Sequence, residues 1–168
     1  EVTLVMKNLG GEVATNSRLS YIQIAPAVAY VSPAGTAVAP FMTWATAANT
    51  LQDALAVVGR DGTGAHTRLA VTSGVYSVGA ELVLDNDYTI QGHGAVSNVV
   101  IQGVSFFSRV LNISHPGATL SGVTVAGGYN TYHLYNGGGI YMTAGLVTNC
   151  IIRNNQVGGM GGGVYQSG

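Results

Sequence analysis

The sequence predicts an all-β protein whose main part is a right-handed parallel β-helix, a solenoid of stacked coils. After residue 67 the chain consists of β-rich segments of about four to eight residues, separated by Gly, Asn or Asp. Similar segments recur every 24 to 27 residues with no helix between them, which is the period of a solenoid. An antiparallel sandwich is the competing prediction, but it requires two-residue hairpin turns, whereas these connections are irregular and contain glycine.

Residues 1–25 are expected to form a separate unit, a short N-terminal β-hairpin. Alternating apolar residues over 2–6 indicate a half-buried strand, the turn NLGGE follows, and residues 19–24 indicate a second strand. Two strands bury too little apolar surface to fold alone. We therefore expect the hairpin to be the end of a larger domain that begins upstream of Glu1, and residues 26–29 to be a linker.

Residues 46–58 predict an α-helix, because their apolar side chains recur at spacings of three and four and Gly59 suits the C-terminal cap. Thr43 or Thr46 is expected to cap the N-terminus. The end coil of a solenoid exposes apolar surface and unpaired strand edges, so we interpret this helix as the N-terminal cap. The chain stops at Gly168 just after a coil has begun. Further coils are therefore expected in the parent protein, and end-to-end self-association is expected through the open coil.

The repeats also predict which side chains stack in the core. The motif GGG[IV]Y occurs twice, 24 residues apart, and an offset of 27 aligns Ile113 with Ile140. Stacked strands lie about 4.8 Å apart, so Ile113, Ile140 and Val164 would form one inward row. Cys150 would be a small buried hydrophobe in a neighbouring row. We interpret the glycine triplets as coil corners, because a phosphate-binding loop would need a helix after it.

The composition restricts the classes of partner. Charged residues make up only 8% of the chain, the net charge is −1, and no basic run is present, which argues against nucleic acid. No apolar stretch approaches the roughly 18 residues of a membrane helix, so we expect no membrane span. A single cysteine excludes an intrachain disulfide and a multi-cysteine metal site.

Residues 30–168 resemble the N-terminal part of pectate-lyase-like parallel β-helix proteins. The resemblance lies in YVSPAGT, in the amphipathic segment TLQDAL, in SGVY at a strand end, and in the IQG that follows. Residues 1–25 are similar to the closing strands of a PKD-type immunoglobulin-like domain. These resemblances imply a modular bacterial protein that is secreted or displayed on the cell surface. They leave the activity open, because the superfamily includes lyases, hydrolases, esterases, adhesins and structural stalks.

Two carboxylates are weak candidates for calcium. Asp85 and Asp87 in LDNDY are two residues apart, so on a strand they would face the same side. The resemblance implies a larger carboxylate cluster in calcium-dependent lyases, whereas DND is also ordinary turn composition. We therefore expect a solvated turn, no resident cofactor, and calcium as the alternative. Arg109 and Arg153 are interpreted as surface residues, and the four histidines as turn residues that share no metal-ligand spacing.

The segment YNTYHLYN, residues 129–136, is an apparent insertion between coils. Its candidate glycan-binding residues are Tyr129, Tyr132, His133 and Tyr135, because exposed aromatic rings stack on sugar faces. Alternatively, the rings pack over the flank of the coil. No catalytic constellation can be assembled from this sequence. We therefore predict a non-catalytic extracellular or cell-surface module that is structural, adhesive or glycan-contacting. The alternative is a fragment of a polysaccharide lyase or glycoside hydrolase whose catalytic coils lie downstream.

Overall fold

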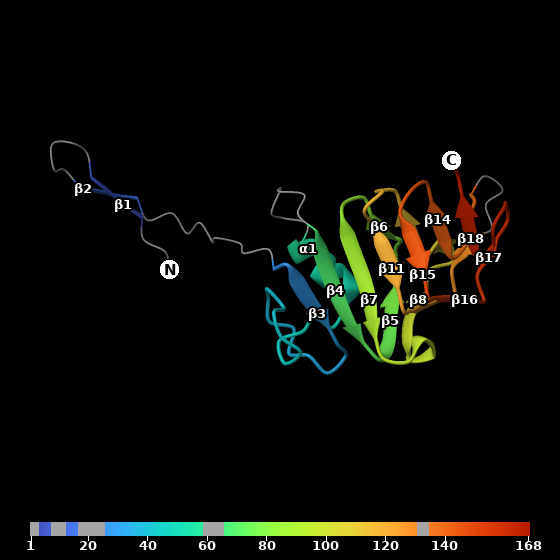
Figure 1. Cartoon of the computed structure of the whole chain (residues 1–168), viewed down its shortest axis with the longest axis horizontal. Helices are drawn as coiled ribbons and strands as arrows, with labels where there is room; N and C mark the ends of the chain where they lie inside the picture. Colours follow the sequence, from blue (N-terminus) through green and yellow to red (C-terminus); the bar gives the residue numbers. More distant parts are fainter. Residues whose placement is uncertain (1–3, 8–12, 17–25, 59–65, 131–134) are drawn as a thin grey trace.

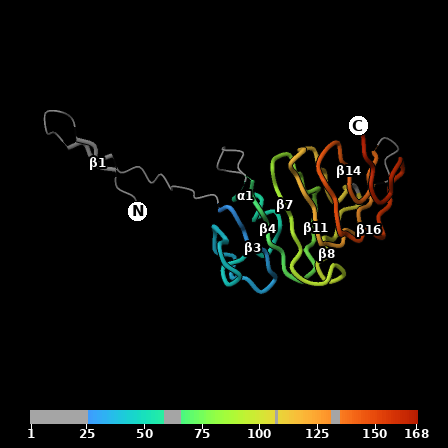
Figure 2. Tube along the Cα trace, viewed as in Figure 1, coloured from blue at the N-terminus to red at the C-terminus, as the bar shows by residue number. Residues whose placement is uncertain are grey.

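The structure, a computed structural model, describes residues 4–7, 13–16, 26–58, 66–130 and 135–168. From residue 28 the described chain winds into a parallel β-solenoid, so the predicted fold class is confirmed (Figure 1). Three parallel sheets run along the solenoid, and neighbouring strands of each sheet come from successive coils. The coils follow one another in chain order along the body of the molecule (Figure 2).

The five-stranded sheet, called sheet 1, has the order β15-β11-β7-β4-β3. Its strands are β3 (Val28–Val31), β4 (Thr67–Thr72), β7 (Tyr88–His93), β11 (Thr119–Ser121) and β15 (Leu146–Thr148). All its neighbours pair in parallel, which excludes the antiparallel sandwich. The sheet begins at Val28, inside the segment expected to be a linker.

Sheets 2 and 3 have four strands each and are also parallel. Sheet 2 contains β5 (Gly74–Val78), β8 (Val99–Gly103), β12 (Thr124–Ala126) and β16 (Ile151–Arg153), with the short helix η1 (Val96–Asn98) before β8. Sheet 3 contains β6 (Leu82–Leu84), β10 (Leu111–Ile113), β14 (Ile140–Met142) and β18 (Val164–Gln166). A small mixed sheet contains β9 (Phe107–Ser108), β13 (Tyr129–Asn130) and β17 (Gln156–Val157).

The core consists of inward side chains stacked coil over coil, but one predicted row is displaced. Ile140 pairs with Val164, as expected, whereas its partner on the other side is Leu111, and Ile113 lies opposite Met142. The predicted stacking of Ile113 on Ile140 is therefore wrong by two residues. The cause is the connection from β10 to β11, which is two residues longer than the one from β14 to β15.

The predicted helix begins later than its sequence pattern indicates. Helix α1 spans Leu51–Val58 and packs against β3 and β4, the first strands of sheet 1, as expected of an N-terminal cap. The preceding chain forms a turn and one isolated bridge to β3, in which the Ala48 amide donates to the Tyr30 carbonyl at 2.9 Å. The N-cap is Thr50, whose Oγ1 accepts the Asp53 amide at 3.1 Å. Thr43 and Thr46, the predicted caps, instead hydrogen-bond to each other at 2.8 Å.

The glycine triplets form coil corners that stack on one another. Gly137 and Gly161 both have left-handed backbone, with φ of +74° and +68°, which glycine adopts without steric cost. The Gly139 amide donates to the Gly162 carbonyl at 2.9 Å, so one triplet lies directly over the next. A Cβ on Gly139 would lie only 2.5 Å from the Gly163 carbonyl oxygen. The repeated glycines are therefore needed for close backbone contact between coils.

The N-terminal strands are β1 (Leu4–Lys7) and β2 (Val13–Asn16), which pair antiparallel. The second strand was expected at residues 19–24, which lie outside the described residues. In the described part of the chain, no helix has the length and hydropathy needed to cross a membrane.

Candidate functional site

Two of the four predicted glycan-binding residues, Tyr129 and Tyr135, lie among the described residues. Tyr129 lies in β13 and packs edge-to-face against Phe106, with ring centroids 6.0 Å apart. Tyr135 is 47% exposed and contacts Arg109 instead, with its ring centroid 5.7 Å from the guanidinium carbon. Tyr132 and His133, the other two candidates, lie outside the described residues.

Arg109 is the centre of a second cluster that the sequence did not indicate. Its Nε lies 2.8 Å from Glu81 Oε2, and its NH1 donates to the Asn136 carbonyl at 3.2 Å. Its guanidinium carbon lies 4.6 Å from the ring centroid of Tyr141. The side chain is only 16% exposed, so its interpretation as an ordinary surface residue is wrong. The carboxylate partner balances the positive charge and fixes the guanidinium under the tyrosine ring.

The tyrosines of the two GGG[IV]Y motifs form the outer part of this cluster. Tyr141 and Tyr165 are register partners on β14 and β18, and their rings stack with centroids 5.7 Å apart and planes 19° from parallel. Since β14 lies between β10 and β18, Arg109 and Tyr165 approach Tyr141 from coils on opposite sides. Tyr135, Tyr141, Tyr165 and Arg109 are called the tyrosine surface below.

The tyrosine surface combines partly exposed rings with a charge that is already balanced. Tyr141 and Tyr165 are half-buried, and Tyr135 is exposed. Rings of this kind offer an apolar face or edge together with a hydroxyl that donates and accepts hydrogen bonds. Such a surface suits a ligand that has both C–H faces and hydroxyl groups, which is the chemistry of a sugar ring.

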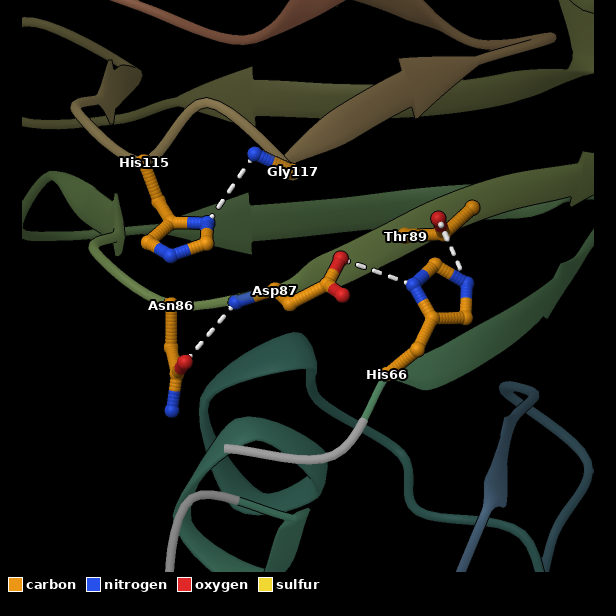
Figure 3. A network of polar contacts seen from close by, with 6 residues as sticks. All are labelled: His66, Asn86, Asp87, Thr89, His115 and Gly117. Atoms are coloured by element: carbon orange, nitrogen blue, oxygen red, sulfur yellow. Dashed lines mark hydrogen bonds and ion pairs between the residues drawn. The ribbon is translucent and has the colours of Figure 1, made fainter. Parts of the chain in front are cut away.

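The two calcium candidates lie in the connection between β6 and β7 and have different surroundings. Asp85 is exposed, whereas Asp87 Oδ1 lies 2.8 Å from His66 Nδ1 (Figure 3). The Asp87 amide donates to Asn86 Oδ1 at 2.9 Å, which is a turn contact. Among the residues that the structure describes, no three His, Cys, Asp or Glu side chains gather into a metal-binding group.

His66 takes part in a polar network and is not an isolated turn residue. Its Nε2 lies 3.3 Å from Thr89 Oγ1, on the opposite side of the ring from Asp87 (Figure 3). Nearby, His115 Nδ1 accepts the Gly117 amide at 3.0 Å. The sequence contains no local signal for this network, because 21 residues separate His66 from Asp87 and only the coil register brings them together.

Cys150 is half-buried against the core, close to the predicted environment. Its Sγ donates to the Thr148 carbonyl at 3.1 Å. Burial raises the pKa of the Cys150 thiol, and hydrogen bonds with nearby backbone groups oppose this shift. The thiol therefore remains protonated at neutral pH and is a poor nucleophile.

No protein-family model, curated protein or solved structure matches this chain. A parallel β-solenoid carries many unrelated activities, so the fold alone does not indicate the function. The side chains of the tyrosine surface and of the His66 network are therefore the features that indicate a function.

Proposed function

We propose that this chain is a module of a secreted or cell-surface protein in which a β-solenoid presents a glycan-contacting surface. The observation that supports this best is the stack of Arg109, Tyr141 and Tyr165, with the exposed Tyr135 beside it. Tyr141 and Tyr165 lie on paired strands of successive coils, so little conformational entropy is lost when a ligand binds to them. Of the four residues first expected to bind glycan, Tyr135 belongs to this surface, and Tyr129 packs against Phe106.

The resemblances in the sequence support the same proposal. Residues 30–168 resemble pectate-lyase-like β-helix proteins, and residues 1–25 resemble the end of a PKD-type domain, a combination that implies a modular extracellular protein. We infer a polysaccharide or surface glycan as the partner. Because Glu81 lies against Arg109, the surface carries little net charge and suits a neutral sugar better than a strongly anionic one.

A glycan array followed by titration calorimetry tests this proposal. Tyr135→Ala and Tyr165→Ala should each weaken binding of a retained glycan about two- to tenfold, because an aromatic contact contributes roughly 0.5–1.5 kcal/mol. Phe106→Ala is the matched control, since it removes an exposed ring outside the tyrosine surface. An array without any retained glycan, or equal affinity in all the variants, would overturn the proposal.

The alternative function places its catalytic coils downstream, so a protein that includes the downstream sequence should be assayed for polysaccharide cleavage. Formation of unsaturated product, followed by its absorbance with and without calcium, would favour the alternative function of a polysaccharide lyase. Release of reducing ends without unsaturated product would favour a glycoside hydrolase. Either result would make this chain part of a polysaccharide-cleaving enzyme in place of a non-catalytic module.

A further inference from the structure

Three polar side chains on the outer face of sheet 1 contact one another in a defined order (Figure 3). Asp87 Oδ1 lies 2.8 Å from His66 Nδ1, and His66 Nε2 lies 3.3 Å from Thr89 Oγ1. The carboxylate and the hydroxyl therefore occupy opposite nitrogens of one imidazole. Carboxylate, imidazole and hydroxyl in this order are the arrangement that activates a hydroxyl as a nucleophile.

One of the three residues lies in a strand, and the other two directly precede strands. His66 immediately precedes β4, Asp87 immediately precedes β7, and Thr89 is the second residue of β7. The Thr67 amide donates to the Asp87 carbonyl at 3.1 Å, which holds the starts of the two strands together. Groups that are placed by paired strands keep their geometry better than groups on a free loop.

The contacts also determine which nitrogen of His66 carries a proton. An ionised carboxylate is only an acceptor, so His66 Nδ1 must donate to Asp87. In the neutral ring, Nε2 then has the free lone pair and accepts the hydroxyl proton of Thr89. This is the protonation pattern that a general base requires.

A cation, Arg68, lies on the same face of the sheet as the hydroxyl. Arg68 on β4 is the register partner of Thr89, so both side chains are on the outer face of the sheet. Arg68 NH1 lies 3.4 Å from Oε1 of Gln91, the next outward residue on β7. A guanidinium beside the attacked carbonyl group stabilises the negative oxygen that develops there.

We propose that Thr89, His66 and Asp87 form a site that hydrolyses carboxylic esters. Thr89 Oγ1 forms a bond to the carbonyl carbon as its proton moves to His66 Nε2, and the carbonyl electron pair moves onto the carbonyl oxygen, on the sheet face that also carries Arg68. Collapse of this intermediate breaks the bond to the alcohol, which leaves with the proton from His66. Water then gives a proton to His66 and attacks the acyl group on Thr89. The carboxylic acid is released, and the proton returns to Thr89.

The exposure of the site indicates the kind of substrate. The His66 side chain is 56% exposed, and Thr89 lies on an outward sheet face, so an ester on a large molecule reaches it. An acylated polysaccharide is the substrate class that agrees with the glycan-contacting surface, and this part of the inference rests on the proposed function. The esterase chemistry itself does not depend on it.

The test measures hydrolysis of p-nitrophenyl acetate by the full chain, because this probe contains no sugar. Thr89→Val and His66→Gln should each lower p-nitrophenol release at least about tenfold, since general-base catalysis contributes roughly 10²–10⁴-fold. Thr89→Ser should retain activity. Thr119→Val and His93→Gln are matched controls; Thr119 is the register partner of Thr89 one coil further along, and both controls should match the unmodified chain.

Peptide mass spectrometry after an acid quench provides a readout that requires no variant, because it should find the acetyl group on Thr89. Loss of hydrolysis in His66→Gln but not in Thr89→Val would show that the imidazole alone attacks the ester, which would overturn the inference. Acetylation only elsewhere, or hydrolysis no faster than in buffer, would also overturn it. A chain that binds no glycan but hydrolyses the probe through Thr89 would refute the proposed function and leave the esterase site standing.

Discussion

Replacement of Ile140 by alanine gives the sharpest test of the solenoid core. Ile140 is 0% exposed and lies in the inward row of sheet 3, between Leu111 and Val164. Loss of three buried carbon groups costs about 2.4 kcal/mol, at roughly 0.8 kcal/mol each. The cavity left between two coils raises the expected loss of unfolding free energy to about 3–4 kcal/mol.

Urea denaturation of the full chain, followed by circular dichroism, measures this loss. Ile140→Val should cost about 1 kcal/mol, because it removes a single buried carbon group. Val164→Ala, in the same row but 40% exposed, should cost less than about 1 kcal/mol. If Ile140→Ala costs no more than Val164→Ala, the inward row is assigned to the wrong residues and the stacked core is refuted.

Three further substitutions test the corner, the cap and the thiol. Gly137→Ala should lower the free energy of unfolding by at least about 1–2 kcal/mol, because residue 137 has left-handed backbone. Gly79→Ala should not, because the added Cβ meets open space. The urea midpoints of the two variants measure this difference. Thr50→Ala should cost about 1 kcal/mol, because Asp53 loses its capping partner; an unchanged melting temperature would contradict the assigned cap. The pKa of the Cys150 thiol is raised in the folded chain, so the thiol of the unfolded chain ionises first as the pH rises. The free energy of unfolding therefore falls between the ordinary pKa of the thiol and its raised value in the folded chain. Cys150→Ala should lack that part of the fall, and parallel alkaline urea titrations of both chains would detect it.

The fold was predictable because its signal is distributed over many segments. Each short β segment is weak on its own, but their recurrence indicates coils, and this conclusion survives an error in any single register. Predictions for single residue positions were less accurate. The stacking of Ile113 on Ile140 was wrong because a constant offset cannot detect one longer connection. The helix start was wrong because Ala47 fits the helical spacing, although it is buried outside the helix, next to the isolated bridge that Ala48 forms with Val31 of β3.

The candidate sites were less predictable because they depend on contacts between coils. Arg109 and Glu81 are 28 residues apart, close to one coil, and a search for opposite charges at that spacing would have found them. Tyr141 and Tyr165 were assigned only to corner motifs, although each directly follows an inward residue and must therefore face outward. The contacts among Asp87, His66 and Thr89 left no such signal in the sequence. They depend on the exact register between β4 and β7 and on the orientation of the three side chains.

The repeated GGG[IV]Y motif connects the stability of the solenoid with its proposed function. The Ile140 amide donates to the Gly163 carbonyl at 2.9 Å, and in the next register positions Tyr141 lies opposite Tyr165. The separation of the two rings is therefore set by backbone pairing between coils, and not by the attraction between the rings. A substitution at the glycine corner should disturb glycan binding even though the glycines are not part of the tyrosine surface. Tyr165→Phe should keep the ring spacing and remove only the hydroxyl.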